Sequence, residues 1–434
     1  MPNRVALDQD FPNISASEAW WERAATLIPA GTQTLAKGPT QYVDGVAPKY
    51  LARGKGAHVW DVDGNEFIDL TMAVGPVVLG YGHASVDRAI IEQLERGITF
   101  SLMHPLEVEV AELIRRVVPG ADSVRFSKTG CDVTSAAVRL ARAFTGRNKV
   151  LCCGYHGWHD WYIGTTPRKS GVPLTTRTLT EVFPYNDLFS LMEALDDQVA
   201  CVILEPTMFE APDPDYLRVL KRACEAAGAL LVFDEMWTGF RVALGGAQQR
   251  FDVTADLACF SKAIANGMPL SVLTGRADVM HLLEEDVFFF TTFGGEALSL
   301  AAAKATIEDL RELEVPARIE AAGKQLQQGY NELAAKKGLR TKAIGLPCRT
   351  LISFDASAGD PLLQKSLVQQ ELIRHGVLWT GFHNLCLAHG EAEIAHILAA
   401  YERALGALST ALAKGKLAES LRGKPVQPVF RKTR

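Results

Sequence analysis

The stretch A-L-L-V-F-D-E-M-W-T-G, residues 229–239, decides the fold. Its first five residues are apolar and follow Gly228, a pattern typical of a parallel strand that is covered on both faces. The run ends abruptly at Asp234 and Glu235 instead of fading into a polar turn. In open α/β sheets, ligands bind at the carboxyl ends of the strands. We therefore predict a buried strand over 229–234 whose Asp234 points at a bound group.

A second short strand is predicted over 257–260, followed by Ser261 and Lys262. An acid at one strand end and a lysine at a neighbouring one suit a site that needs a fixed negative charge and a nucleophilic amine. Pyridoxal phosphate fits this best, because the lysine would form a Schiff base and Asp234 would keep the pyridine nitrogen protonated. Both residues also have an ordinary interpretation, since a lysine after a strand is usually solvated and Asp-Glu usually caps a helix.

The composition is that of an ordinary globular protein. The 434 residues suffice for two or three domains, and 48% are hydrophobic and 22% charged. The net charge of -5 argues against nucleic-acid binding. No apolar run approaches a membrane span, the first residues lack the order of a signal peptide, and the eight cysteines contain no C-x-x-C pair. We therefore expect a cytoplasmic protein with neither a nucleic-acid nor a membrane partner, and no metal site.

Two further strands end in segments that suit a phosphorylated, flat cofactor. The strand predicted over 123–127 leads through K-T-G-C-D, residues 128–132, into a helix. Such a turn presents backbone N–H groups to an anion, although most such turns bind nothing. The strand over 149–153 ends at G-Y-H-G, residues 154–157, whose rings either stack on a flat ligand or pack at the core edge.

The remaining segments complete the sheet and predict a second, smaller unit. A third buried strand over 199–204 ends at Glu205-Pro206, with Glu210 shortly after. Asp63-Gly64 marks a hairpin within residues 58–70. Further predictions are helices over 15–28, about 300–336 and 391–412, and strands over 271–274, 351–354 and 376–379. A basic tail, expected to be solvated and mobile, carries Lys414, Lys416, Arg422, Lys424, Arg431, Lys432 and Arg434.

Taken together, these motifs resemble the class III aminotransferases of fold type I, and among them most closely the glutamate-1-semialdehyde 2,1-aminomutases. The resemblance runs from about residue 29 to 305, and more weakly to the last helix. Its strongest pieces are W-D-V-D-G-N-E-F-I-D, G-P-V-V-L-G-Y-G-H, V-R-L-A-R-A-F-T-G-R, Y-H-G, V-I-L-E-P, L-L-V-F-D-E-M-W-T-G-F-R-V-A-L-G-G-A-Q and S-K-A-I-A-N-G-M-P. It implies pyridoxal 5'-phosphate as cofactor and a homodimer with a shared active site.

The resemblance also implies the architecture. We expect an α/β fold with a large domain, built on a mostly parallel sheet of the seven-stranded type flanked by helices, and a smaller α+β domain. The large, cofactor-binding domain would span residues 60–300. The smaller domain would combine residues 1–59 with 301–413, and the basic tail would follow over 414–434.

Carried over residue by residue, the resemblance implies roles for single side chains. Lys262 would be the Schiff-base lysine that also moves the proton, and Asp234 would be the partner of the pyridinium. Glu210 falls where related enzymes carry a glutamate that helps them switch between two substrates. The other cofactor-binding residues would be Tyr155, His156 and Met236 beside the ring, Thr129, Gly130 and Cys131 at the phosphate, and Thr292, which would reach the phosphate of the neighbouring subunit.

Departures from the aminomutase pattern bear on the substrate. Lys37 stands where the aminomutase has an arginine that grips the substrate carboxylate, and lysine cannot make the bidentate fork. Val74 replaces a tryptophan, and the stretch between residues 164 and 184 is shorter than the aminomutase's mobile lid. His383 and Asn384 either lie at the mouth of the site or pack within a loop. By position alone, Arg349 is a candidate for binding a carboxylate.

These differences favour an aminotransferase that moves an amino group from a donor to a separate carbonyl acceptor, such as a keto-sugar or another polar ketone or aldehyde. The reaction would use a Schiff base on Lys262 and a pyridoxamine phosphate intermediate. A glutamate-1-semialdehyde-type aminomutase is the first alternative. A decarboxylase or epimerase is the second, because both would share Lys262 and Asp234. A binding protein without activity is disfavoured, because Tyr155 and Thr292 are retained as well.

Overall fold

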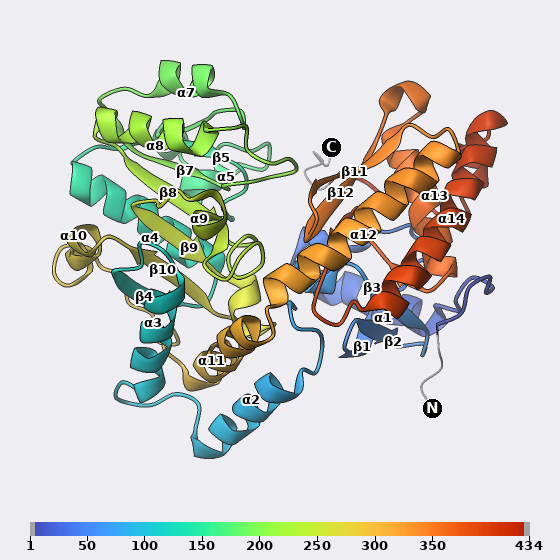
Figure 1. Cartoon of the computed structure of the whole chain (residues 1–434), viewed down its shortest axis with the longest axis horizontal. Coiled ribbons are helices and arrows are strands. Elements are labelled where there is room, and N and C mark those ends of the chain that lie inside the picture. The colour runs from blue at the N-terminus through green and yellow to red at the C-terminus, as the bar shows by residue number, and fades with distance from the viewer. Residues whose placement is uncertain (1–4, 429–434) are drawn as a thin grey trace. The chain divides into compact units, whose positions relative to one another are not determined.

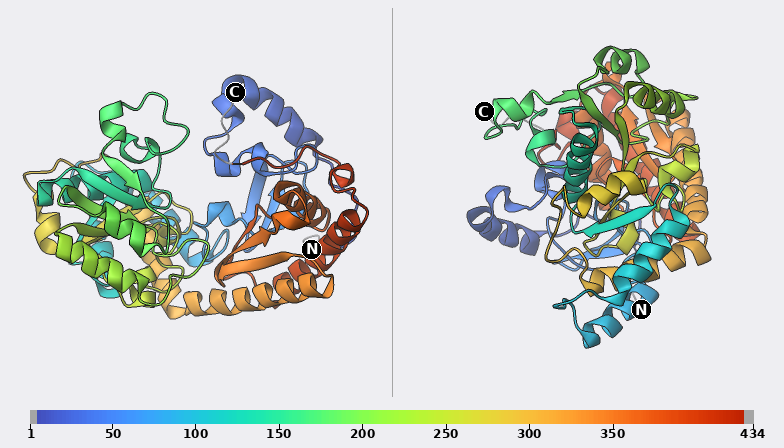
Figure 2. Two further views of the ribbon diagram at one scale, coloured as in Figure 1. Left: turned by 90° about the horizontal axis from the view of Figure 1, so that it is seen from above. Right: turned by 90° about the vertical axis from the view of Figure 1, so that its left-hand side faces the viewer.

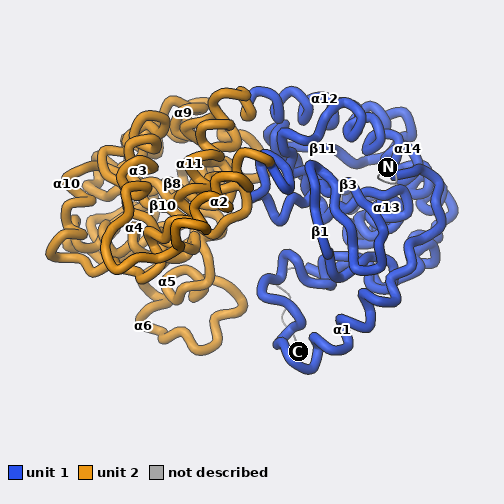
Figure 3. The backbone as a smooth tube through the Cα atoms, turned by 90° about the horizontal axis from the view of Figure 1, so that it is seen from below, with its two compact units in different colours: residues 1–83, 317–434 blue, residues 84–316 orange. Residues whose placement is uncertain are grey.

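The computed structural model describes residues 5–428, which form two compact units (Figure 3). Unit 1 combines the chain up to His83 with the chain from Ala317 onward, and unit 2 is Ala84–Pro316. These boundaries differ from the predicted ones at 59/60 and 300/301. The hairpin that contains residues 60–69 joins unit 1 because its second strand pairs with a strand near residue 377. The helix after residue 296 stays in unit 2 because it packs against two helices there.

Unit 2 is built on a seven-stranded sheet in the order β4-β10-β9-β8-β7-β5-β6. Neighbouring strands are parallel except at β10, which runs antiparallel to both β4 and β9. This confirms the predicted α/β fold with a mostly parallel sheet. The strands are β4 (Ser123–Ser127), β5 (Lys149–Cys153), β6 (Thr180–Val182), β7 (Val199–Leu204), β8 (Leu230–Glu235), β9 (Leu257–Phe260) and β10 (Ser271–Gly275).

Helices cover this sheet because each carries an apolar face (Figure 1). In α4 the buried residues include Val133, Ala137 and Leu140, which share one core cluster with residues of β7, β8 and β9. Helix α8 ends at Gly228, whose φ of +67 only glycine adopts readily. The helices of unit 2 are α2 (Ala84–Arg96), α3 (Pro105–Val117), α4 (Gly130–Thr145), α5 (Asp160–Ile163), α6 (Leu174–Arg177), α7 (Leu188–Ala194), α8 (Tyr216–Ala227), α9 (Gly246–Phe251), α10 (Ala277–Met280) and α11 (Ala297–Glu312).

The described residues of unit 1 form two smaller sheets and four α-helices. The order is β1-β2-β3-β13 in one sheet and β11-β12-β14 in the other. The predicted hairpin is confirmed: β2 pairs with β3 around Gly64, whose φ is +89. The strands are β1 (Leu51–Lys55), β2 (His58–Asp61), β3 (Glu66–Asp69), β11 (Thr341–Leu346), β12 (Arg349–Phe354), β13 (Val377–Leu378) and β14 (Phe382–Asn384), and the helices are α1 (Ser15–Leu27), α12 (Val315–Lys336), α13 (Pro361–Arg374) and α14 (Glu391–Ala413).

The single helix predicted over about 300–336 is two helices in the structure. Helix α11 ends at Glu312 and α12 begins at Val315, with Glu314 between them at a φ of +48, outside the helical region. Figure 2 shows α12 running along β11. Asn331 of α12 accepts a hydrogen bond from the backbone N–H of Ala343 at 2.8 Å, which ties the helix to that strand.

Arg422 and Lys424 of the basic tail are exposed, as predicted, but hydrogen bonds tie residues 420–426 to unit 1. The side chain of Gln370 accepts a hydrogen bond from the N–H of Arg422 at 2.7 Å and donates one to the carbonyl of Ser420 at 3.2 Å. Val426 is buried and its N–H donates to the hydroxyl of Ser366. Arg431, Lys432 and Arg434 lie outside the described residues. Over residues 5–428, no helix is both long and apolar enough to cross a membrane.

Gln369 of α13 links three segments of unit 1 through a fully buried amide. Its Oε1 accepts from the N–H of Val43 at 2.8 Å, and its Nε2 donates to the carbonyls of Gln41 at 3.1 Å and Trp379 at 2.7 Å. These backbone groups are interior, where an unpaired polar atom costs about 1–3 kcal/mol.

We expect Gln369→Leu to lower the free energy of unfolding by about 3 kcal/mol or more, because leucine keeps the volume but leaves three backbone groups unpaired. Urea denaturation followed by circular dichroism measures the change. Gln325→Leu, at an exposed position of α12, is the matched control and should change stability by less than about 0.5 kcal/mol. Equal stability of the two variants would contradict this role.

Glu235, the last residue of β8, is a buried acid held by three donors. Its side chain accepts from the hydroxyl of Thr238 and from the N–H groups of Ala247 and Gln248. Burial raises the pKa of Glu235 to about 7, and the hydrogen bonds only partly offset this effect. Gly246, at a φ of +73, makes room for the carboxylate, since a Cβ there would lie 2.5 Å from Oε2.

The raised pKa of Glu235 predicts a loss of stability with rising pH. The folded state keeps the proton between pH 4.5 and about 7, so the stability it contributes is full below the unfolded pKa and is lost as pH approaches 7. Relative to Glu235→Gln, the native chain should lose about 3 kcal/mol between about pH 5 and pH 8. Urea unfolding across that range measures this. Glu225→Gln, at an exposed position, should show a constant difference; a constant difference for Glu235→Gln would refute the assignment.

Candidate active site

Four predicted site segments follow the carboxyl ends of neighbouring parallel strands in unit 2. In the register of the sheet, Asp234 of β8 lies beside Cys259 of β9, three residues before Lys262. On the other side, Phe233 lies beside Leu204, and Leu204 lies beside Cys153. Because these strands are parallel, the residues that follow them converge at one edge of the sheet, which is where open α/β sheets bind ligands.

Asp234 is a buried carboxylate paired with His156. Its Oδ2 lies 2.8 Å from His156 Nδ1, and both side chains are almost fully buried. His156 Nε2 lies 3.1 Å from the carbonyl of Cys153, which only accepts, so Nε2 carries a proton. A second proton therefore lies between Nδ1 and Asp234. The N–H of Met236 donates to Oδ1 at 3.0 Å. This pairing allows an acid to remain at the end of a buried strand.

Glu205, at the end of β7, connects the strand ends on either side. Its Oε1 accepts from the N–H of Tyr155 at 2.8 Å, and its Oε2 accepts from the indole N–H of Trp237 at 2.9 Å. Gly154 has a φ of +107, and a Cβ there would lie 2.6 Å from Glu205 Oε1. No role for Glu205 is predicted from the sequence. Its position after a buried strand and before a proline is the pattern that could have identified it.

The first turn of α4 forms an anion-binding end. Asp132 accepts from the N–H of Thr129 and the hydroxyl of Ser127, both at 2.8 Å. Burial raises the pKa of Asp132, but these hydrogen bonds outweigh it and hold the pKa below its usual value. The N–H groups of Gly130 and Cys131 stand in the first turn of a 16-residue helix, where no intrahelical acceptor exists and the helix dipole favours an anion.

Close packing brings the start of α4 to the other predicted residues. A Cβ on Gly130 would lie 2.8 Å from Met236 Sδ, and a Cβ on Gly157 would lie 2.5 Å from Cys131 Sγ. Thr134 of α4 donates to the carbonyl of His156 at 3.0 Å. These contacts hold residues 154–157 against the first turns of α4, so the two predicted cofactor-binding segments form one assembly.

Ser135 of α4 adds contacts with residues at the start of α5. Its hydroxyl oxygen accepts from the indole N–H of Trp161 at 3.0 Å and lies 2.7 Å from His159 Nδ1. Trp161 in turn stacks on His156, with ring centroids 6.0 Å apart. The ring of Tyr155 is 52% exposed and meets Tyr162 edge to face. The loop is thus fixed while Tyr155 remains half-exposed.

Lys262 adopts a backbone conformation that is unusual for a residue with a side chain. It begins a short 3₁₀ helix, Lys262–Ala265, with a φ of +48. The left-handed region costs such residues about 1–2 kcal/mol and is retained mainly at functional sites. Ala263, Ile264 and Ala265, which follow it, are almost fully buried, so the core holds the lysine in place.

These residues fit pyridoxal phosphate. A buried, paired carboxylate suits the ring nitrogen, an exposed aromatic suits the ring face, free first-turn N–H groups suit the phosphate, and a lysine follows the adjacent strand. Two other predicted residues belong to segments outside these strand ends and the first turn of α4. Glu210 and Thr292 are exposed on irregular segments, and the carbonyl of Glu210 accepts from the hydroxyl of Thr207. In the part of the chain that the structure describes, no three His, Cys, Asp or Glu side chains could hold a metal ion.

In unit 1, Lys37 and Val74 lie near one another, and the backbone around Val74 is strained. Lys37 lines a cavity of about 250 Å³ together with Tyr42, Asp69 and Ala73. Residues 72–75 all have positive φ, including Val74 at +71, which is rare for a β-branched residue. Hydrogen bonds to Asp69 from the N–H of Thr71 and the hydroxyl of Tyr81 support this turn.

His383 and Asn384 point to opposite faces of β14, so only one of them stays a candidate. His383 is buried, with Nδ1 2.7 Å from the Thr350 hydroxyl and Nε2 2.7 Å from the Tyr401 hydroxyl. Burial lowers the pKa of His383 to about 3. His383 is therefore an interior side chain of unit 1, which favours the packing alternative over the site mouth. Asn384 donates to the carbonyl of Thr71 and accepts from Arg349 Nε at 3.2 Å, which places it beside the strained turn.

Comparison with known proteins identifies the family. The class-III aminotransferase model matches residues 43–388. The 3-aminobutyryl-CoA aminotransferase of Cloacimonas acidaminovorans is 33% identical over 405 residues, which cover 90% of this chain and 97% of that protein. The glutamate-1-semialdehyde 2,1-aminomutase of Methanothrix thermoacetophila is 37% identical over 348 residues, covering 76% and 80%. The PLP internal aldimine form of the FumI protein of Sphingopyxis sp. MTA144 superposes with a TM-score of 0.86 at 30% identity, covering 92% of this chain and 97% of that one. The chain therefore belongs to the class III aminotransferases and is an enzyme that depends on pyridoxal phosphate.

Proposed function

We propose that the enzyme transfers an amino group from a donor to a separate carbonyl acceptor. The observation that carries this proposal is the register of β8 and β9, which brings Asp234 and the segment that begins with Lys262 to one edge of the sheet. The cytoplasm stays the proposed location, since all eight cysteines are free thiols, as is usual in a reducing compartment.

Each site residue has a distinct task in this proposal. When bound, the cofactor stabilises negative charge at the carbon that carries the amino group. Lys262 Nζ would hold the cofactor and, once free, would remove the proton from that carbon of the donor; in the second half reaction it would deliver a proton to the carbonyl carbon of the acceptor. Asp234 would keep the ring nitrogen protonated, while His156 balances the buried charge at Oδ2. Tyr155 and Met236 would lie against the ring faces. The N–H groups of the Thr129–Cys131 turn would bind the phosphate, and Thr292 would reach the phosphate of the neighbouring subunit.

Several features support two separate substrates. Lys37 replaces the arginine of the aminomutases, and Glu210 falls where related enzymes switch between two substrates. One relative, matched over 97% of its length, is a 3-aminobutyryl-CoA aminotransferase, although two aminomutases are matched over 98% and 99% of theirs. We infer that the acceptor is a polar ketone or aldehyde, with keto-sugars within that class, and that Lys37, Val74 and Asn384 contribute to its selection.

The second candidate function is that of a glutamate-1-semialdehyde aminomutase, because such an enzyme is 37% identical over 348 residues. An aminomutase moves the amino group within one molecule and needs no external acceptor. The two functions therefore differ in whether donor and acceptor act in separate half reactions.

The deciding experiment follows the absorbance of the purified holoenzyme as amino donors are added one at a time. We expect one donor to bleach the yellow cofactor band and a carbonyl acceptor to restore it, because the two half reactions are separate. Lys262→Ala should lower the rate of bleaching by at least about 1,000-fold, whereas Lys221→Ala, on the surface of α8, should leave it unchanged. Conversion of glutamate 1-semialdehyde without any external acceptor would favour the aminomutase. A band that no donor bleaches would contradict amino transfer.

An exposed apolar surface in unit 2 supports the proposed homodimer. Leu102 and Met103 are 79% and 82% exposed, and Phe288 and Phe293 are 72% and 59% exposed. The two segments adjoin, because the N–H of Ala297, shortly after Phe293, donates to the carbonyl of Ile98. Exposed apolar side chains on adjoining segments often mark a protein interface, and Thr292 belongs to the second segment.

We expect the double variant Leu102→Asp, Met103→Asp to be monomeric, because two carboxylates would have to be buried in the interface. Sedimentation velocity measures the change in mass. Phe189→Asp alters a similarly exposed apolar residue on α7 and should stay dimeric. The monomer should also retain less cofactor, since Thr292 would no longer reach the neighbouring phosphate. A native enzyme that sediments as a monomer would refute the proposed dimer.

A further inference from the structure

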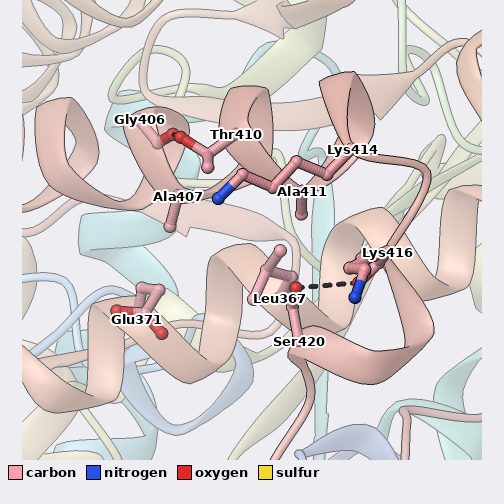
Figure 4. Close-up of a pocket in the computed structure, with 9 residues that line it drawn as sticks. All are labelled: Leu367, Glu371, Gly406, Ala407, Thr410, Ala411, Lys414, Lys416 and Ser420. Carbon is pink, nitrogen blue, oxygen red and sulfur yellow. Dashed lines mark hydrogen bonds between the residues drawn. The ribbon is translucent and has the colours of Figure 1, made fainter.

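The tail that follows α14 forms one wall of a cavity in unit 1 (Figure 4). Helices α13 and α14 form the other walls. Gln370 of α13 fixes the tail, because its amide binds both the carbonyl of Ser420 and the N–H of Arg422. Ser420 in turn donates its hydroxyl to the carbonyl of Lys416 at 2.8 Å. The turn after α14 is thus held in place, and the cavity is a built feature of the fold.

The cavity is large enough for a small metabolite. Its volume is about 410 Å³, within the range of about 300–1,000 Å³ usual for ligand sites. Leu367 of α13 and Ala411 of α14 are buried and form an apolar floor. Gly406 and Ala407, on the same helix as Ala411, leave the space open because they carry little or no side chain.

The rim of the cavity carries charges of both signs. Lys414 and Lys416 come from the tail, and Glu371 comes from α13. Lys416 pairs with Glu419 at 3.3 Å. The carboxylate of Glu371 is largely buried, with Gln370 Nε2 at 3.2 Å and its nearest cation, on Arg374, 3.8 Å away. Among the described residues, Lys414 has no ion-pair partner. Figure 4 shows its amine extending over the cavity on the side where Glu371 lies.

This charge arrangement selects among ligands. A polyanion would be attracted by the lysines but repelled by Glu371, and a cation would meet the opposite conflict. A zwitterion satisfies both, with its carboxylate toward Lys414 and its ammonium toward Glu371. The apolar floor would then receive a short hydrocarbon side chain, as Leu367 and Ala411 contribute no polar group.

We propose that this cavity binds a free α-amino acid with a small apolar side chain. The site shares no residue with the proposed catalytic set and does not depend on the proposed amino transfer. Lys414 and Lys416 form a wall of the cavity, so the site also assigns the basic tail a function that was not predicted from the sequence.

The test measures binding of L-valine to the full-length holoenzyme by equilibrium dialysis, after confirming that valine leaves the cofactor absorbance unchanged. Isobutylamine and 3-methylbutanoate, which lack the carboxylate and the amine respectively, serve as probes for single-charge recognition. We expect saturable binding of valine at millimolar concentration or below, and at least about tenfold weaker binding of either analogue.

Variants locate the site. Glu371→Gln and Lys414→Met should each weaken valine binding about tenfold, and Ala407→Leu should abolish it by filling the cavity. Lys324→Met, at an exposed position of α12, is the matched control and should leave binding unchanged, as should Lys262→Ala at the catalytic lysine. Valine binding that survives Glu371→Gln and Ala407→Leu, or that Lys262→Ala removes, would overturn the proposal. So would binding of either analogue as tight as that of valine, or no saturable binding by the native enzyme.

Discussion

The buried charge of Asp234 is the constraint on which the arrangement of unit 2 depends. A carboxylate with almost no exposed surface needs a partner, and His156 supplies one at 2.8 Å. Because the carbonyl of Cys153 holds the other ring nitrogen, the imidazole cannot turn away. Glu205, one strand further on, is a second carboxylate with fixed partners: it accepts hydrogen bonds from the backbone of Tyr155 and from the indole of Trp237. Two carboxylates thus tie together the ends of β5, β7 and β8, and an aromatic ring remains exposed beside them.

Strain is the second constraint, and it occurs at candidate site residues in both units. Lys262 lies in the left-handed region immediately before three buried residues. Met72, Ala73 and Val74 also lie in the left-handed region, one after another, shortly after the buried Asp69 in the chain. Such conformations persist only when the surroundings determine them. In each case the surrounding core and hydrogen bonds are dense enough to do so, which explains how reactive or ligand-facing side chains keep a fixed direction.

Unit 1 relies on buried amides rather than on long strands. Gln369 satisfies three backbone groups of two segments, and Gln370 satisfies two backbone groups of the tail. A side-chain amide offers a donor and an acceptor at one place, so it can replace ladder hydrogen bonds where an extended segment has no strand beside it. Through these hydrogen bonds the basic tail, whose composition is typical of a solvated segment, becomes part of the folded unit and forms the wall of a cavity.

The sequence by itself determined the strands of the large sheet except β6, and the residues at their ends. Strands β4, β5, β7 and β9 have the predicted bounds, because each is an apolar run of strand length that ends in a polar turn. Asp234 and Lys262 could be singled out for the same reason, since a polar residue directly after a buried run is visible in the sequence. The family resemblance then supplied the cofactor, because its motifs lie along the chain in order.

Only the tertiary structure decided which neighbours these residues have. His383 and Asn384 are both buried, but which partners each contacts depends on the register of β14 against β12, and a shift of one residue would exchange the faces to which they point. Glu205 gains its role from residues 50 positions before it and 32 after it. The unit boundary depends on the pairing of β3 with β13, and the tail depends on Gln370. These contacts join residues far apart in the chain, and no local pattern of hydrophobicity or spacing encodes them.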